Sequence, residues 1–194
     1  MTTPKRTVTL TDPRALRALA HPTRMKLVGL LRRHGPLTAT QAGALLGEVP
    51  ASASFHLRQL AKYGLVEEAP GGKGRERPWQ ATARFTSWSG VGGGPQMQAA
   101  AQLLSTVVAD RYHEQVVEWL EQQADEPREW QEAAHLSDAM LYLTAEELKQ
   151  LGERLMAQIE PYLDRIADPA RRPAGARMVS VIQLAFPTEP PDAK

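Results

Sequence analysis

The sequence predicts an α+β protein that is mainly α-helical. Apolar residues recur every three to four positions over several segments, Pro and Gly mark the ends of these segments, and only short stretches resemble strands. A chain of 194 residues can hold two small domains, each with its own core. We expect a first domain at 12–86, a Gly-rich linker at 87–95, a long amphipathic helix at 96–124 and a small α+β domain at 130–187.

Start and stop signals divide the first domain into four helices. Asp12 before Pro13 is a typical helix start, and Pro22 ends the first helix and begins the second. Gly35-Pro36 ends the second helix, and Thr38 is a candidate cap for the third. The third and fourth helices are expected at about 38–46 and 51–63, with a turn between them. Residues 1–11 are expected to form a loose leader.

A short hairpin is predicted after the fourth helix. Residues 65–68 and 79–83 read as its strands, and the Gly-rich, basic residues 70–77 lie between them. Helix, helix, helix-turn-helix and hairpin, in this order, make the plan of a winged helix-turn-helix. In that plan the last helix fits the major groove of DNA and the hairpin, or wing, reaches along the backbone.

The fourth helix has two distinct faces. Ala53, Leu57 and Leu60 are expected to pack on the core, whereas Ser52, Phe55, Gln59 and Lys62 lie on the other side. Small hydroxyl residues near the helix start permit close approach of a phosphate. The predicted DNA-binding residues are Thr38, Thr40, Gln41, Ala51, Ser52, Ser54, Phe55, His56, Arg58, Gln59, Lys62, Lys73, Arg75 and Arg77. For His56, packing against the core is an equal alternative.

Charge is distributed unevenly along the chain. Residues 1–88 contain 14 Lys and Arg and 5 Asp and Glu, a net charge of +9, and residues 89–194 contain 9 and 17, a net charge of −8. A basic half next to an acidic half favours a polyanion as partner of the first half. We therefore expect double-stranded DNA as a partner.

The first domain resembles the arsenical-resistance-repressor (ArsR) family of winged-helix regulators. The segments that carry the resemblance are ALAHPTRMKLVGLL (18–31), LTATQAGALLG (37–47) and ASASFHLRQLAKYGLVEE (51–68), followed by the basic wing. The resemblance covers residues 12–83 and implies a homodimer that binds an operator and represses transcription until an effector releases it. The chain departs from the family's metal sensors, because it has no Cys and no matched Asp and His pairs on the long helix.

The long helix is the candidate dimer seam, although it could also be an ordinary core helix. Its stripe supplies the predicted dimerisation residues Met97, Ala101, Leu104, Val108 and Tyr112. Beyond it, residues 139–143 and 177–186 are expected to form strands, and Thr144 with Glu147 predicts a capping box for a helix to about 167. Trp119, Trp130, Tyr142 and Phe186 are candidates for a pocket that binds a small organic effector, or are plain core.

Other functions have less support in the sequence. No phosphate loop, nucleophile elbow or metalloprotease motif is present, so we expect no enzyme, no catalytic residues and no cofactor. Asp110, His113 and Glu114 could hold a metal, but they read as a surface polar cluster, and we expect no metal. The N-terminus lacks the apolar core of a signal peptide, and no apolar run could span a bilayer, which predicts a cytoplasmic protein without a membrane partner. The alternatives are a winged helix that binds protein and an enzyme domain fused to a DNA-binding domain.

Overall fold

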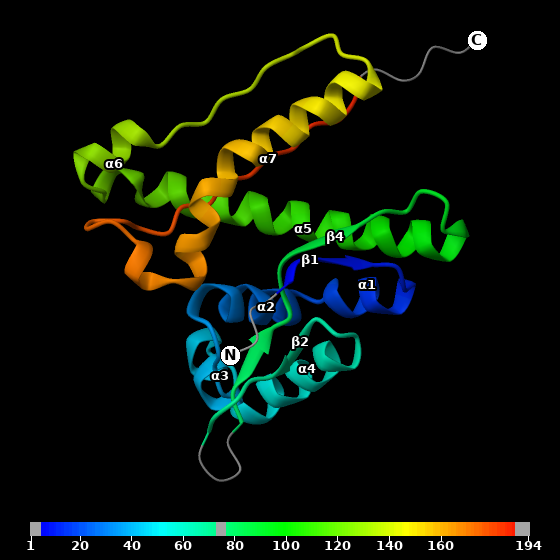
Figure 1. Ribbon diagram of the computed structural model, residues 1–194, viewed down its shortest axis with the longest axis vertical. Helices are drawn as coiled ribbons and strands as arrows, with labels where there is room; N and C mark the ends of the chain where they lie inside the picture. Colours follow the sequence, from blue (N-terminus) through cyan, green and yellow to red (C-terminus); the bar gives the residue numbers. More distant parts are fainter. Residues whose placement is uncertain (1–4, 73–76, 189–194) are drawn as a thin grey trace. The chain divides into compact units, whose positions relative to one another are not determined.

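The structure is a computed structural model that describes residues 5–72 and 77–188, and it divides into two compact units (Figure 1). Unit 1 comprises Met1–Val116 and unit 2 comprises Val117–Lys194. The described part of the chain is mainly helical with two small sheets, as the sequence predicts. Within that part, no helix is both long enough and apolar enough to cross a membrane.

Unit 1 is a winged helix-turn-helix with one additional strand before it, one additional strand after the wing, and most of a long helix that follows. Its elements in order are β1 (Lys5–Leu10), α1 (Pro13–Leu19), α2 (Pro22–His34), α3 (Ala39–Leu46), α4 (Pro50–Lys62), β2 (Val66–Glu68), β3 (Trp79–Ala81), β4 (Ala83–Trp88) and most of α5 (Gly94–Gln122). The predicted start signals are confirmed. Asp12 accepts a hydrogen bond from the backbone N–H of Arg14, and Thr38 forms a capping box with Gln41.

The core of unit 1 is built from one face of each helix. Leu16, Leu27, Leu57 and Leu60 are fully buried, and Leu65 and Val66 of the wing close the core from the side. Leu45 of α3 does not contribute to this core, because it is 53% exposed. Helix α3 has only two turns, and it uses Ala42 and Gly43 as its buried residues instead.

Residues 5–10, which we expected to belong to a loose leader, form a strand. Strand β1 pairs in parallel with β4, in a register that places Thr7 opposite Phe85 and Leu10 opposite Trp88. Leu10 is 4% exposed and belongs to the core cluster. Strand β1 therefore belongs to the core of unit 1. Its partner β4 covers residues 83–88, where we expected the return strand of the hairpin to end and the Gly-rich linker to begin.

Helix α5 begins earlier than expected and packs directly on the winged helix. It starts at Gly94, within the predicted linker, and its Met97, Ala101 and Leu104 are buried in the core of the same chain. Leu104 is completely inaccessible. These three side chains therefore cannot line a seam with a second copy while this core is intact. Val108 and Tyr112 are partly buried, and Val108 packs against the same core.

Unit 2 contains the end of α5, short helical segments η1 (Gln123–Asp125), α6 (Arg128–Ala133) and η2 (Pro169–Arg171), and the long α7 (Ala145–Ala167). The capping box of Thr144 and Glu147 is confirmed. The strands predicted at 139–143 and 177–186 are not formed. A strand requires a hydrogen-bonded neighbour, and neither segment pairs with another strand in the described residues. Their apolar composition could predict burial but could not supply that partner.

Candidate nucleic-acid interface

Helices α3 and α4 meet at a tight turn that fixes the start of α4. The backbone N–H of Glu48 donates to the carbonyl oxygen of Gly43 at 2.9 Å, and Gly47 takes a left-handed conformation with φ 69°. A Cβ atom at Gly43 would lie 2.7 Å from the carbonyl oxygen of Glu48. Gly43 is therefore needed for this close approach, which brings the first turns of α3 and α4 to the same side of the domain.

Helix α4 presents three faces. Ala53, Leu57 and Leu60 are fully buried, as predicted. Ser52, Phe55, Gln59 and Lys62 are half-buried or exposed, and Phe55 is 51% exposed. A third face is formed by Ala51, Ser54 and Arg58, which recur every three to four residues and line a hollow.

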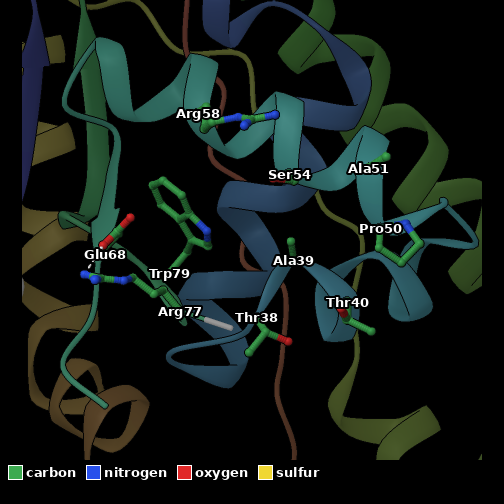
Figure 2. Close-up of a pocket in the computed structure, with 10 residues that line it drawn as sticks. All are labelled: Thr38, Ala39, Thr40, Pro50, Ala51, Ser54, Arg58, Glu68, Arg77 and Trp79. Atoms are coloured by element: carbon green, nitrogen blue, oxygen red, sulfur yellow. Dashed lines mark hydrogen bonds and ion pairs between the residues drawn. The ribbon is translucent and has the colours of Figure 1, made fainter. Parts of the chain in front are cut away.

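The hollow lies between the first turns of α3 and α4 and the wing (Figure 2). Its volume is about 530 Å³ and it is open to solvent. The lining residues are Thr38, Ala39, Thr40, Pro50, Ala51, Ser54, Arg58, Glu68, Arg77 and Trp79. Hydroxyl groups and two guanidinium groups thus surround one concave surface, a combination of donors that suits phosphate oxygens and base edges.

The wing is joined to the start of α3 through Trp79. The backbone N–H of Trp79 donates to the carbonyl oxygen of Leu37 at 2.7 Å, and the N–H of Leu37 donates back at 3.0 Å. Glu68 and Trp79 are opposite each other in the β2–β3 pair. This bridge holds the indole side chain in the wall of the hollow, so the wing and the helix-turn-helix form one continuous surface.

Two arginines give the hollow its charge, but only one has a carboxylate partner. Arg77 donates a 3.0 Å hydrogen bond to Glu68, and both side chains are largely exposed. Arg58 is exposed and has no carboxylate partner among the described residues. Arg58 is therefore the arginine of this surface that is ready for an anionic partner.

His56 packs inward and does not face the hollow. Its ring centroid lies 4.8 Å from that of His21, which precedes α2, and the Nδ1 atoms of both rings are buried without a hydrogen-bond partner. Burial, followed by the positive charge of Arg24, lowers the pKa of both imidazoles, and Glu48 opposes this effect. The packing role considered for His56 fits this position better than a phosphate contact.

The other predicted DNA-binding residues differ in how free their side chains are to contact a partner. Thr40 is exposed, Gln41 uses its side-chain oxygen to cap α3, and Lys62 lies 5.7 Å from the ring centroid of Tyr63. Lys73 and Arg75 lie outside the described residues. Four lining residues of the hollow are not among the predicted DNA-binding residues: Ala39, Pro50, Glu68 and Trp79. The strand register and the bridge to Leu37 bring Glu68 and Trp79 to the hollow, and neither can be recognised from the residue types.

Two of the four residues predicted to line an effector pocket are largely exposed. Tyr142 is 96% exposed and Phe186 is 69% exposed. Trp130 is partly buried beneath Arg177, whose guanidinium lies 4.9 Å from the ring centroid and also pairs with Glu126. Aromatic side chains need a shared cavity to act as a pocket, and the unpaired segments 139–143 and 177–186 leave Tyr142 and Phe186 largely in solvent. In the described residues, no three His, Asp or Glu side chains lie close enough together to hold a metal ion.

Comparison with known proteins agrees with the helix-turn-helix. Residues 19–69 match the model of a family described as a helix-turn-helix domain. That match covers less than half of the chain, and it includes α2, α3, α4 and β2. The class defined by the fold and by this match is therefore a winged helix-turn-helix domain. No curated protein matches the chain.

Three solved structures are similar to parts of the chain. One is the homodimeric winged helix-turn-helix DNA-binding domain (fragment 1-100) of Mb0332 from Mycobacterium bovis, described as a possible ArsR-family transcriptional regulator. It is 22% identical over 52% of this chain and 79% of that chain, with a TM-score of 0.35. RV1404 from Mycobacterium tuberculosis is 16% identical over 77% and 82%, with a TM-score of 0.32.

The apo form of MarR from E. coli is 17% identical over 77% of this chain and 87% of that chain, also with a TM-score of 0.32. All three TM-scores are low. They therefore say nothing about the arrangement of the whole chain.

Proposed function

We propose that the protein is a transcription regulator that binds double-stranded DNA through α3, α4 and the wing. The observation that carries this proposal is the hollow in which Thr38, Ser54, Arg58 and Arg77 converge from these three elements. Helix α4 inserts its exposed residues into the major groove, and the hollow receives the adjacent backbone. The basic excess of residues 1–88 adds a sequence-independent attraction.

The contacts divide into two kinds. Arg58 and Arg77 bind phosphate and fix the orientation of the domain, whereas Ser54 and Gln59 read base edges. Phosphate contacts release counterions, so affinity for all duplexes falls steeply as salt is raised. Base contacts affect only the preferred site, and each is worth about 1–3 kcal/mol of discrimination.

The direct experiment measures binding to duplex DNA by fluorescence anisotropy, first with a random pool and then with sites selected from it. We expect Arg58→Ala to weaken binding to every duplex and to lower the salt slope. Arg33→Ala is the matched control, because Arg33 is exposed on α2 outside the hollow and carries the same charge. Equal losses in both variants, or no binding of the wild type at low salt, contradict the proposal.

We further propose that the regulator is an ArsR-like homodimeric repressor. One winged helix reads too few base pairs to select an operator, so two copies on an inverted repeat supply the missing specificity. Because Leu104 is buried in its own chain, the seam must use the outward face of α5. On that face Leu103 is 48% exposed.

Sedimentation of Leu103→Glu tests this seam. The charge adds a desolvation cost at an interface but none on a free surface, so we expect the wild type to sediment as a dimer and the variant as a monomer. Gln102→Glu is the control, because Gln102 is also exposed on α5, next to Leu103. A monomeric wild type at tens of micromolar, or a dimeric Leu103→Glu variant, contradicts the proposed seam.

A further inference from the structure

Arg32 is a partly buried cation without an acidic partner. It extends from α2 to β4, where its Nε donates to the carbonyl oxygen of Ala83 at 3.0 Å and a terminal nitrogen donates to Oγ1 of Thr86 at 2.7 Å. Both acceptors are neutral. Burial, and secondly the nearby charge of Arg111, lowers the pKa of Arg32 to about 10. A positive charge that is largely shielded from solvent normally pairs with a carboxylate. No carboxylate pairs with Arg32 in the described residues.

Arg111 brings a second guanidinium to the same face of α2. One terminal nitrogen donates to the carbonyl oxygen of Met25 at 3.2 Å. The group also lies directly against Gly29, where an added Cβ atom would come within 2.9 Å of the other terminal nitrogen. Met25, Gly29 and Arg32 follow one another at helical spacing on α2, so Arg111 lies beside the face of α2 from which Arg32 extends. Its charge is close enough to lower the pKa of Arg32. The two guanidinium groups repel each other, and no described carboxylate pairs with either one.

The hydrogen bonds in place leave donors on both groups. A guanidinium has five N–H donors, and the bonds above use two from Arg32 and one from Arg111. Both side chains are only partly buried, so solvent still reaches them. Val108 and Tyr112, which are partly buried beside Arg111 on α5, supply an apolar border and a hydroxyl group.

We propose that Arg32 and Arg111 form a binding site for a small carboxylate with an apolar body. Two adjacent guanidinium groups suit the two oxygens of a carboxylate, and the ligand's charge removes their mutual repulsion. The apolar part lies against Val108 and Tyr112. The site is within unit 1, at the junction of α2, β4 and α5, and shares no residue with the DNA-facing hollow.

Such a ligand would tighten the attachment of α5 to the winged helix. This effect makes the carboxylate a candidate effector, and that part of the inference rests on the proposed function. Binding of the carboxylate to Arg32 and Arg111 does not depend on the proposed function. If the ligand favours one position of α5, and DNA favours another, each weakens the binding of the other by the same factor.

Sodium benzoate is the probe, and benzamide is its neutral control of similar shape. Thermal unfolding and the Nε–H signals of the arginines in ¹H–¹⁵N spectra report binding. We expect benzoate, but not benzamide, to raise the Tm of the wild type and to shift signals of Arg32 and Arg111, since a ligand that binds only the folded state stabilises it. Equal effects of the two compounds, or no effect of benzoate, would overturn the proposal.

Two variants test the geometry. Arg111→Gln removes one charge, and Gly29→Ala keeps both charges but displaces the flexible tip of Arg111. We expect each to weaken benzoate binding by about tenfold or more, the effect of one charge-assisted hydrogen bond. Arg33→Gln should bind as the wild type does. Gly29→Ala is also expected to fold, since Ala favours helix, and circular dichroism checks this. Benzoate binding that survives both changes refutes the site.

Titration of benzoate into the protein–DNA complex separates the two proposals. If the wild type binds benzoate but no duplex, the proposed function fails and the carboxylate site stands. If duplex binding is intact and benzoate does not change its affinity, the effector role is excluded. A fall in sedimenting mass on adding benzoate would show that a carboxylate of a second copy occupies the site, which overturns the assignment to a free ligand.

Discussion

The guanidinium of Arg77 and the carboxylate of Glu68 form an ion pair of 3.0 Å in the wall of the hollow. Both side chains are exposed, so the pair contributes little to stability. It has a larger effect on DNA, because Glu68 adds a negative charge to the proposed interface and neutralises Arg77. Glu68→Gln should therefore increase the affinity for random duplex by about threefold to tenfold and make the salt slope steeper, because Arg77 then contacts phosphate without a competing carboxylate.

Glu67→Gln is the matched control for this prediction. Glu67 is the neighbouring residue of β2, is also exposed, accepts a hydrogen bond from Gln80 and does not line the hollow. Anisotropy titrations at several salt concentrations measure both variants. The role given to Arg77 is contradicted if the two substitutions have equal effects, or if Arg77→Gln leaves the salt slope unchanged.

Leu104 and Leu103 are neighbours on α5 with opposite environments, since Leu104 is fully buried and Leu103 is 48% exposed. Leu104→Ala should lower the free energy of unfolding of unit 1 by about 2–5 kcal/mol, because it leaves a cavity in the core. Leu103→Ala should change it by less than about 0.5 kcal/mol at concentrations where the protein is monomeric. Urea unfolding followed by circular dichroism makes the comparison. Equal losses would mean that the first half of α5 is not part of the core.

The winged helix could be predicted from the sequence because its signals are local. Asp12, Thr38 and the Gly and Pro residues between helices act on their immediate neighbours, and Leu57 and Leu60 follow helical periodicity. The pairing of β1 with β4 could not be predicted in this way, because it joins segments almost eighty residues apart, as in the pair Leu10 and Trp88. A hydrophobic stripe likewise shows that one face of a helix is buried, but it does not show which surface covers that face. For this reason Leu104, which packs in the core of its own chain, was predicted to lie in a dimer seam.

The proposed interface was predictable only in part. Ser54 and Arg58 follow from the spacing along one helix, and both line the hollow. Trp79 and Glu68 reach the hollow because of the strand register and the bridge to Leu37, neither of which has a signature in the residue types. In unit 2, apolar segments such as 177–186 indicated strands by composition, but strand formation depends on a pairing partner that composition does not specify.

The partly buried pair of His21 and His56 predicts a pH dependence of stability. Burial and Arg24 hold the pKa of both rings below the ordinary value of 6.5. The unfolded chain therefore binds more protons than the folded protein as pH falls below about 6.5, and the free energy of unfolding decreases in that range. Urea unfolding at pH 7.5 and pH 5.5 measures the difference.

His56→Gln should reduce this pH dependence, whereas His113→Gln should not, because His113 is exposed on α5. Arg24 and Glu48 are the charged groups that act on the pair, and Phe55 lies edge-on to His56 at 5.4 Å. A His56→Gln variant with an unchanged pH dependence would show that other groups cause it.

Ala51 allows DNA binding to be separated from folding by a single charge. It is exposed in the first turn of α4, lines the hollow, and has no acidic neighbour in that turn. A carboxylate in the first turn favours the helix, so Ala51→Glu should leave Tm unchanged or raise it slightly. The same charge would face phosphate in the proposed complex. We therefore expect a loss of affinity of about tenfold or more for all duplexes, which would be smaller at high salt.

Gln96→Glu places an equal charge in the first turn of α5, also without an acidic neighbour, but outside the hollow. It should keep nearly all of the affinity, because Gln96 does not line the hollow and salt screens an exposed charge that contacts no phosphate. If Ala51→Glu binds duplex as well as Gln96→Glu does while both remain folded, the hollow between α3, α4 and the wing is not where the protein meets DNA.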